Sequence, residues 1–340
     1  MIYKFKERKE RDRMKKRRLG TNGLETSVLG FGCMGLNYHR GPAKDRSEMI
    51  RVVHSAFDAG ITMYDTAEVY GPYTNEELVG EALAGQRSKV QIATKGGLKI
   101  TGSSNEPDSR PESIISSVEG SLKRLRTDYI DLYYIHRVDP NVPIEEVALT
   151  MQQLKKDGKI LHWGLSEASA ETIRRAHGVE PLAAVESEYS IWWREVENSI
   201  FPALEQLGIG LVAYSPLGRG FLTGKIDKNA SFSENDNRGE LPRFAKDAME
   251  ANQTIVDFLN KVAEQKQATP AQIALAWILS QKPFIVPIPG TTTVSRISEN
   301  AASAEIVFTE REMLQINEEI ASIQIVGDRY PEAEKRRTGK

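Results

Sequence analysis

Four ionisable residues stand at or just beyond the ends of short apolar segments that are typical of buried strands. Asp65, Lys95 and His136 each close or follow such a segment, and Tyr70 lies five residues after Asp65. If the strands run parallel, their carboxyl ends meet on one face of the fold. In barrels of alternating strands and helices, polar residues on that face are usually catalytic.

The chemistry of this set can be deduced from its residue types. A phenol is a poor proton donor at neutral pH because its pKa is about 10, but a nearby ammonium such as Lys95 stabilises the phenolate of Tyr70. Asp65 would keep Lys95 charged, since a buried lysine without a partner tends to lose its proton. His136 could donate a hydrogen bond to a carbonyl oxygen or relay a proton to the phenol. The set predicts protonation of a developing alkoxide, with the hydride supplied by a nicotinamide cofactor, because no side chain can supply one.

The composition fits one large domain. The chain has 340 residues, of which 40% are hydrophobic and 27% charged, enough for a single barrel-sized core. The net charge of -2 gives no reason to expect nucleic acid or an anionic membrane as partner. No apolar stretch reaches the roughly 18 residues of a membrane span, and the start lacks the apolar core of a signal peptide. We therefore expect a cytoplasmic protein, whose monomeric or homo-oligomeric state the sequence leaves open.

Both ends of the chain are rich in charge. Residues 1–14 predict a charged, mobile tail in which Met14 is a possible true start, and a nucleic-acid-binding arm is the alternative interpretation. Residues 15–322 then form the single domain, and residues 323–340 form a C-terminal tail.

Segments with strand and helix patterns alternate between these ends. Strands are predicted at residues 29–32, 61–65, 90–95, 129–136, 160–166, 182–187, 209–214 and 284–288. Helices are predicted at residues 46–59, 75–84, 111–125, 144–156, 170–176, 199–207, 247–265, 270–280 and 294–304. Eight such pairs predict an α/β fold, a closed (β/α)8 TIM barrel with extra C-terminal helices. A hairpin around Asn22-Gly23 would cap its bottom. A doubly wound open sheet is the alternative, but the glycines of residues 30–35 lead into a loop and not into a helix.

Three segments resemble the signatures of the aldo-keto reductase superfamily. These are residues 60–71, 92–95 and 128–136, which fall in its order and spacing. The resemblance covers residues 15 to about 320 and implies a barrel that binds NADPH without a Rossmann domain and reduces aldehydes or ketones. It implies that Tyr70 is the general acid, that Asp65 and Lys95 tune it, and that His136 orients the carbonyl.

The resemblance extends to contacts with the nicotinamide half of the cofactor. Residues 164–167 are similar to the segment in which a Ser and a following Asn hold the carboxamide, but here Glu167 follows Ser166. Glu186 stands where the family usually has Gln, and a carboxylate accepts hydrogen bonds but donates none. In residues 212–220, the tyrosine implied to stack under the nicotinamide is Tyr214, and the following loop approaches the pyrophosphate. The contacts implied on this side are Cys33, Met34, Asp65, Ser166, Glu167, Glu186, Tyr214, Ser215, Leu217 and Arg219.

Residues 288–300 resemble the adenosine end of the site, where backbone amides at a helix start and Arg296 bind the 2′-phosphate. Many relatives carry a lysine or arginine among the positions that Gly290, Thr292 and Thr293 occupy here. We therefore predict NADPH as the cofactor, with NADH as the alternative. The contacts implied at this end are Gly290, Thr291, Arg296, Glu299 and Asn300.

The substrate is a small-molecule carbonyl compound whose identity the sequence leaves open. Aromatic residues in predicted loops at the active face are candidates for its pocket, namely Tyr38, Trp192, Trp193 and Phe244. Two other functions fit parts of the pattern. Lys95 alone could form a Schiff base as in aldolases, and a redox-sensing subunit could keep the barrel and the cofactor yet act through partners. Asp65, Tyr70 and the cofactor segments favour the reductase.

Overall fold

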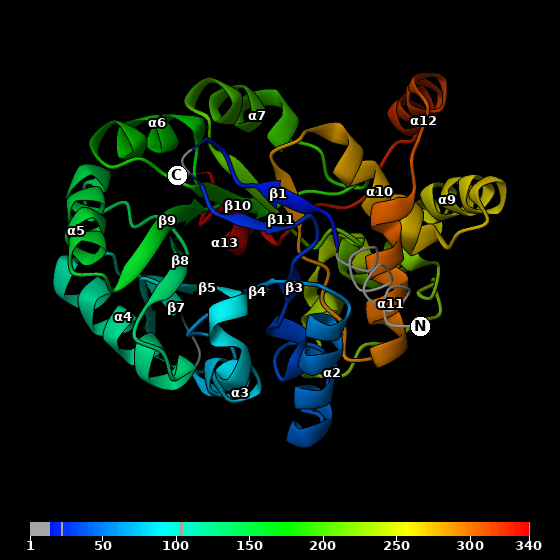
Figure 1. Ribbon diagram of the computed structural model, residues 1–340. Coiled ribbons are helices and arrows are strands. Elements are labelled where there is room, and N and C mark those ends of the chain that lie inside the picture. Colours follow the sequence, from blue (N-terminus) through cyan, green and yellow to red (C-terminus); the bar gives the residue numbers. More distant parts are fainter. Residues whose placement is uncertain (1–13, 22, 102–104, 340) are drawn as a thin grey trace, which may run out of the picture.

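Eight parallel strands form the centre of the molecule. The computed structural model describes residues 14–21, 23–101 and 105–339. The strands are β3 (Phe31–Gly32), β4 (Met63–Asp65), β5 (Gln91–Gly96), β8 (Ile130–Ile135), β9 (Ile160–Ser166), β10 (Ala184–Glu188), β11 (Gly210–Tyr214) and β12 (Ile285–Pro287). Each pairs with the next along the chain, and the Gly30 amide donates to the Pro287 carbonyl (2.9 Å), which joins the last strand to the first. The predicted (β/α)8 barrel is confirmed (Figure 1).

Helices surround the barrel and bury its outer face. They are α2 (Arg46–Asp58), α3 (Thr74–Leu83), α4 (Pro111–Leu125), α5 (Ile144–Lys156), α6 (Ala170–Val179), α7 (Val196–Leu207), α8 (Lys246–Ala251), α9 (Gln253–Lys266), α10 (Pro270–Gln281), α11 (Val294–Ala302), α12 (Glu310–Ser322) and α13 (Glu332–Lys335). Helix α4 shows the pattern: it begins at a proline, and its buried residues Ile114, Val118, Leu122 and Leu125 recur every three or four positions. Strand β8 is buried throughout because helices cover one face and the barrel interior the other.

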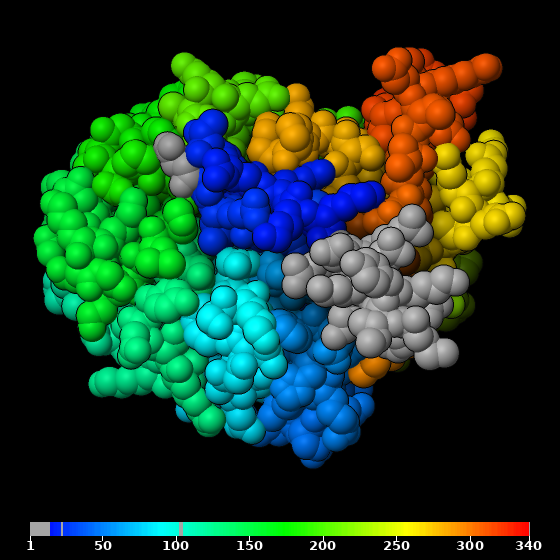
Figure 2. All heavy atoms as spheres, in the orientation of Figure 1, coloured from blue at the N-terminus to red at the C-terminus, as the bar shows by residue number. Residues whose placement is uncertain are grey.

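The predicted N-terminal hairpin closes the bottom of the barrel. It consists of β1 (Lys16–Arg18) and β2 (Glu25–Ser27), which pair antiparallel. Figures 1 and 2 show this segment lying across the centre of the barrel. Leu19 is fully buried and packs into the barrel interior with Met63, Leu132 and Val212. Residues 1–13 of the predicted tail lie outside the described residues, while Met14, the last residue of that predicted tail, packs against the core.

Three parts of the chain differ from the prediction. The segment predicted as one helix, residues 247–265, is two helices, because Asn252 lies between α8 and α9 and its side chain bonds both the amide and the carbonyl of Val326 (2.8 Å each). A second hairpin, β6 (Leu98–Ile100) with β7 (Asn105–Pro107), follows β5. The segment predicted as a C-terminal tail returns to the barrel: Arg329 is buried, and the Gly339 amide donates to the Glu167 carbonyl (2.8 Å).

None of the described helices combines the length and the apolar character needed to cross a lipid bilayer.

Candidate active site

The carboxyl ends of the strands open into one cavity of about 820 Å³. Asp65 ends β4, Lys95 is the second-to-last residue of β5, and His136 follows β8. Because these neighbouring strands are in parallel register, their ends lie at the same height in the barrel. Most of the candidate residues line this cavity: Met34, Tyr38, Asp65, Tyr70, His136, Ser166, Glu186, Tyr214, Ser215, Leu217, Arg219, Gly290, Thr291, Arg296, Glu299 and Asn300.

Lys95 lies beneath the cavity floor and is held by acidic and carbonyl oxygens. Its ammonium group donates to Asp65 Oδ1 and to the Thr66 carbonyl (3.0 Å), and it lies 3.3 Å from Glu186 Oε2. Burial lowers the pKa of Lys95, but Asp65 and Glu186 outweigh burial and hold the pKa above its ordinary value. Lys95 is therefore a fixed positive charge, which disfavours the Schiff-base interpretation because that chemistry requires the neutral amine.

Glu186 makes this cluster a set of three ionisable groups where a glutamine would leave two. Burial, together with the adjacent carboxylate of Asp65, raises the pKa of Glu186 well above its usual range. The proton of the pair therefore resides on Glu186, and the cluster holds one ammonium, one carboxylate and one carboxylic acid. A protonated Glu186 can donate a hydrogen bond as well as accept one, and its donor faces the Asp65 carboxylate, so the shared proton helps to hold the cluster together.

Tyr70 lies over Lys95 at the cavity floor. Its ring centroid is 5.5 Å from Lys95 Nζ and 5.9 Å from the ring of His136. Burial raises the pKa of Tyr70, and the opposing effect of Lys95 is smaller, so the phenol is protonated at neutral pH. The ring of Tyr38 lies 5.8 Å from that of Tyr70 and covers it from the cavity side.

His136 is a neutral imidazole in this environment. Burial lowers the pKa of His136 well below its usual value, and the positive charges of Arg137, Lys95 and Arg337 lower it further. Of the two roles predicted for it, this favours the hydrogen-bond donor over the proton relay. Its Nδ1 is buried without a hydrogen-bond partner among the described residues.

The segment that joins Asp65 to Tyr70 is anchored by Glu68. The amide of Glu68 donates to the Lys95 carbonyl (3.1 Å), and its carboxyl group accepts from Ser117 Oγ and lies 3.8 Å from the Arg124 guanidinium. Burial raises the pKa of Glu68 from 4.5 to about 7. The site is therefore built on an acid that resists ionisation in the folded state.

This pKa shift predicts a loss of stability as the pH rises. The folded protein holds the Glu68 proton between pH 4.5 and 7 while the unfolded chain releases it, so this group destabilises the fold by up to about 3 kcal/mol above pH 7 and has no effect below pH 4.5. We expect Glu68→Gln to raise the free energy of unfolding in urea at pH 8 and to leave it nearly unchanged at pH 5. Two curves that stay parallel across this pH range would contradict the prediction.

The outer part of the cavity carries a group of arginines. Arg219 lies in η3 (Gly218–Thr223), and its Nη2 donates to Glu188 Oε2 (3.2 Å), while Arg238 donates to the Arg219 carbonyl (3.2 Å). Burial and the neighbouring charges of Arg219 and Arg238 lower the pKa of Arg40 to about 9. Arginines crowded to this degree favour a bound polyanion, and they fit a dinucleotide pyrophosphate.

The far end of the cavity is the start of α11. Gly290, Thr291, Arg296, Glu299 and Asn300 line it together. Arg296 is exposed in the first turn of the helix and lines the cavity there, beside the amides at the start of the helix. This end suits the adenosine part of a dinucleotide.

Besides Lys95, five of the candidate residues do not line the cavity: Cys33, Glu167, Trp192, Trp193 and Phe244. Cys33 is buried in the core, and its amide donates to the Asp65 carbonyl (2.8 Å). The ring of Trp192 stacks on Phe221 (4.6 Å) and meets Phe244 edge-on (5.8 Å), so the candidates Trp192 and Phe244 pack in a buried aromatic cluster. Trp193 lies under the guanidinium groups of Arg243 and Arg329.

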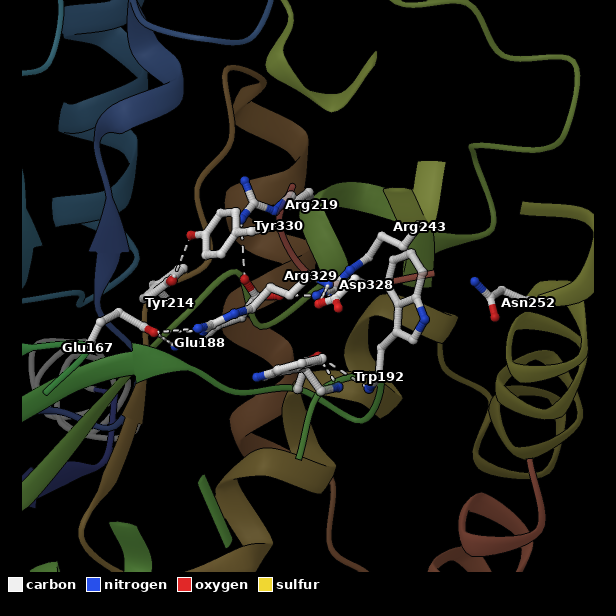
Figure 3. A network of polar contacts seen from close by, with 12 residues as sticks. Glu167, Glu188, Trp192, Tyr214, Arg219, Arg243, Asn252, Asp328, Arg329 and Tyr330 are labelled. Carbon is white, nitrogen blue, oxygen red and sulfur yellow. Dashed lines mark hydrogen bonds and ion pairs between the residues drawn. The ribbon is translucent and has the colours of Figure 1, made fainter. Parts of the chain in front are cut away.

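Glu167 faces away from the cavity and holds the C-terminal segment (Figure 3). Arg329 donates to both of its carboxylate oxygens (2.9 and 2.6 Å), and the Glu188 amide donates to Oε1 (2.9 Å). Tyr330, beside Arg329, has its hydroxyl 3.0 Å from that of Tyr214. Glu188 in turn pairs with Arg219 and Arg243, so one buried network joins the C-terminal segment to η3, which carries Arg219.

Several residues of the cavity wall were not among the candidates. They include Arg40, Leu98, Asn105, Arg137, Arg238, Tyr330, Glu334 and Arg337. Arg137 had a local signal, since it directly follows His136. Tyr330 and Arg337 had none, because they reach the cavity through contacts with residues far away in the sequence.

Comparisons with known proteins agree with this geometry. The model of the Aldo/keto reductase family matches residues 28–321. Probable aldo-keto reductase 1 of Glycine max is 44% identical over 320 residues, which cover 92% of this chain and 91% of that protein. A glycerol dehydrogenase from Gluconobacter oxydans superposes with a TM-score of 0.83 at 32% identity (91% and 95% of the two chains), and the holo form of an aldo-keto reductase from Bacillus halodurans with 0.75 at 27% identity (90% and 96%).

The family match spans most of the chain, and the identity to the plant protein extends over nearly the full length of both. The chain therefore belongs to the aldo/keto reductase family and is an NAD(P)-dependent oxidoreductase.

Proposed function

We propose that this protein reduces aldehydes or ketones to alcohols with NADPH, with Tyr70 as the proton donor. The observation that carries this proposal is the phenol ring of Tyr70, 5.5 Å from the buried Lys95 ammonium, in a cavity whose wall extends from His136 to Arg296 at the start of α11. The bound nicotinamide would supply the hydride. The chain supplies the proton, the charge that stabilises the resulting phenolate, and the groups that orient both partners.

Each member of the catalytic set has one role in this proposal. Tyr70 donates its proton to the alkoxide oxygen as it forms. Lys95 stabilises the phenolate that remains, and Asp65 keeps the ammonium of Lys95 in place. Neutral His136 donates a hydrogen bond to the carbonyl oxygen and so fixes its position beside the phenol.

The residues around the cavity fit the rest of the cofactor. Ser166 and Glu186 line the wall where the carboxamide would lie, and the ring of Tyr214 offers an apolar surface for the nicotinamide. The arginine group would hold the pyrophosphate. Since Gly290 and Thr292 carry no charge, Arg296 is the cation proposed to contact the 2′-phosphate.

Replacement of Arg296 with Ala tests that assignment. We expect the Kd for NADPH to rise by about tenfold or more, which corresponds to a lost charge-assisted contact of about 1.4 kcal/mol, while the Kd for NADH changes by less than about twofold. Quenching of protein fluorescence by each cofactor measures both constants. Arg311→Ala, an exposed arginine of α12 outside the cavity, is the matched control. Equal losses for the two cofactors would show that Arg296 does not contact the 2′-phosphate.

A spectrophotometric assay tests the function itself. NADPH and NADH oxidation would be followed with aromatic aldehydes, short aliphatic aldehydes, dicarbonyl compounds and ketones, beside a fluorescence titration of each cofactor. Turnover with at least one carbonyl class is the expected result. Tight cofactor binding without turnover on the whole panel would contradict the proposal and favour a redox-sensing subunit.

A further inference from the structure

Arg137 is a cation at the reacting end of the cavity that no carboxylate of the described residues contacts, although Glu167 favours its charge from a greater distance. It directly follows His136 and lines the cavity wall. Its Nη1 donates to the His136 carbonyl (2.7 Å) and to Ser166 Oγ (3.1 Å), both of which are neutral acceptors. In the part of the chain that the structure describes, its guanidinium makes no ion pair with any carboxylate.

Two other arginines of the cavity wall, Arg40 and Arg296, also have no ion pair among the described residues, but they line the parts of the cavity proposed for the pyrophosphate and the adenosine. The remaining three are paired: Arg219 with Glu188, Arg238 with Asp236, and Arg337 with Glu334 (3.3 Å). Their charges are balanced by the protein, and those of Arg219 and Arg238 lie at the pyrophosphate end of the cavity. A partly buried guanidinium stays charged, and leaving it without a counter-ion is unfavourable. The charge of Arg137 is thus available to a ligand.

The position of Arg137 indicates which ligand this is. It comes from the same strand end as His136, and its charge is close enough to lower the pKa of that imidazole. A ligand group bound by Arg137 therefore lies beside the reacting carbonyl and away from the phosphates of a dinucleotide. The planar fork of a guanidinium binds a carboxylate through two parallel hydrogen bonds, which also fixes its orientation.

We propose that the preferred substrates are carbonyl compounds that carry a carboxylate, which Arg137 binds while His136 and Tyr70 hold the carbonyl oxygen. This inference rests on the proposed carbonyl reduction and adds the substrate class. Two other roles for Arg137 make different predictions: it could support only the binding of the cofactor, or only the fold.

Matched aldehydes separate these possibilities. The 3- and 4-carboxybenzaldehydes present a carboxylate at two distances from the reacting carbon, and the corresponding formylbenzamides are neutral analogues of nearly the same shape. The amide group withdraws electrons more strongly than the carboxylate, so intrinsic reactivity favours the amides. We expect at least one acid to exceed its amide by about tenfold or more in kcat/KM, mainly through a lower KM, and this advantage to shrink as salt is raised to about 0.5 M.

Variants of Arg137 complete the test. Arg137→Met should bring the ratio of acid to amide to about one, and Arg137→Lys should keep part of it, because the charge remains but the fork is lost. Arg175→Met, which removes a surface arginine paired with Glu145, is the control and should keep the full ratio. Thermal unfolding of each variant shows whether the fold is intact.

Two results would overturn the proposal while leaving carbonyl reduction intact. One is a native enzyme whose kcat/KM for each amide equals or exceeds its kcat/KM for the matching acid. The other is an Arg137→Met variant that loses acids and amides equally, with a raised Kd for NADPH, which would assign Arg137 to the cofactor. Absence of turnover with all four aldehydes, while the cofactor binds, would reject the proposed function and this inference together.

Discussion

Replacing Lys95 with Met is expected to lower kcat for carbonyl reduction by about 10³-fold. The ammonium of Lys95 lies 5.5 Å from the ring centre of Tyr70, and a unit charge at this range stabilises a phenolate by about 3–4 kcal/mol at the effective dielectric constant of a protein. This is about 2–3 powers of ten in rate, and the loss of order in Asp65 adds to it. Steady-state kinetics with the best carbonyl of the panel measure the effect.

The variant also leaves a buried carboxylate without its partner. Asp65 and Glu186 both contact Lys95, and the loss of a buried ion-pair partner costs about 3–5 kcal/mol. The double variant Asp65→Asn/Lys95→Met removes both charges and should recover most of the stability but none of the activity. Lys159→Met, at a surface pair with Glu119, controls for the substitution itself. Near-normal turnover of a stable Lys95→Met protein would rule out the role of the ammonium.

The barrel could be predicted because its signals are local. Each strand is a short apolar run, each helix an amphipathic segment, and the catalytic residues stand at the points where one pattern gives way to the other. The positions of Asp65, Lys95 and His136 on one face follow from this alternation alone, since parallel strands must present their carboxyl ends together.

The outer wall of the cavity could not be predicted in this way. Arg329 and Glu167 are 162 residues apart, and no local pattern of sequence marks a contact of this kind. The break between α8 and α9 has the same origin, because Asn252 leaves the helical pattern to bind Val326. For Trp192 and Phe244 the sequence indicates a loop beside the site, but the side of the loop on which a ring packs depends on partners such as Phe221.

Glu167 and Glu186 show how one sequence feature can have two outcomes. Both replace amide side chains of the family pattern with carboxyl groups. Arg329 lowers the pKa of Glu167 against the effect of burial, so this residue is a charged anchor for the C-terminal segment. Glu186 has Asp65 beside it and therefore keeps its proton. Only the partners, which the sequence does not place, distinguish the two.

Replacing Tyr70 with Phe is expected to reduce kcat by about 10³-fold or more while the Kd for NADPH changes by less than about twofold. The substitution removes the proton donor, and general acid catalysis contributes about 10²–10⁴-fold, but the ring that packs against Tyr38 and His136 remains. Tyr129→Phe, whose ring stacks with Arg87 outside the cavity, is the matched control and should keep native turnover.

The pH profile of the native enzyme gives an independent check on the same assignment. Burial raises the pKa of Tyr70 above 10 and lowers the pKa of His136, so neither group changes its charge between about pH 7 and 9. We therefore expect kcat for reduction to be nearly constant over this range. A steep fall centred near pH 7 to 8, together with turnover of Tyr70→Phe within tenfold of native, would identify a different proton donor. A flat profile with an inactive Tyr70→Phe would leave the phenol as the acid.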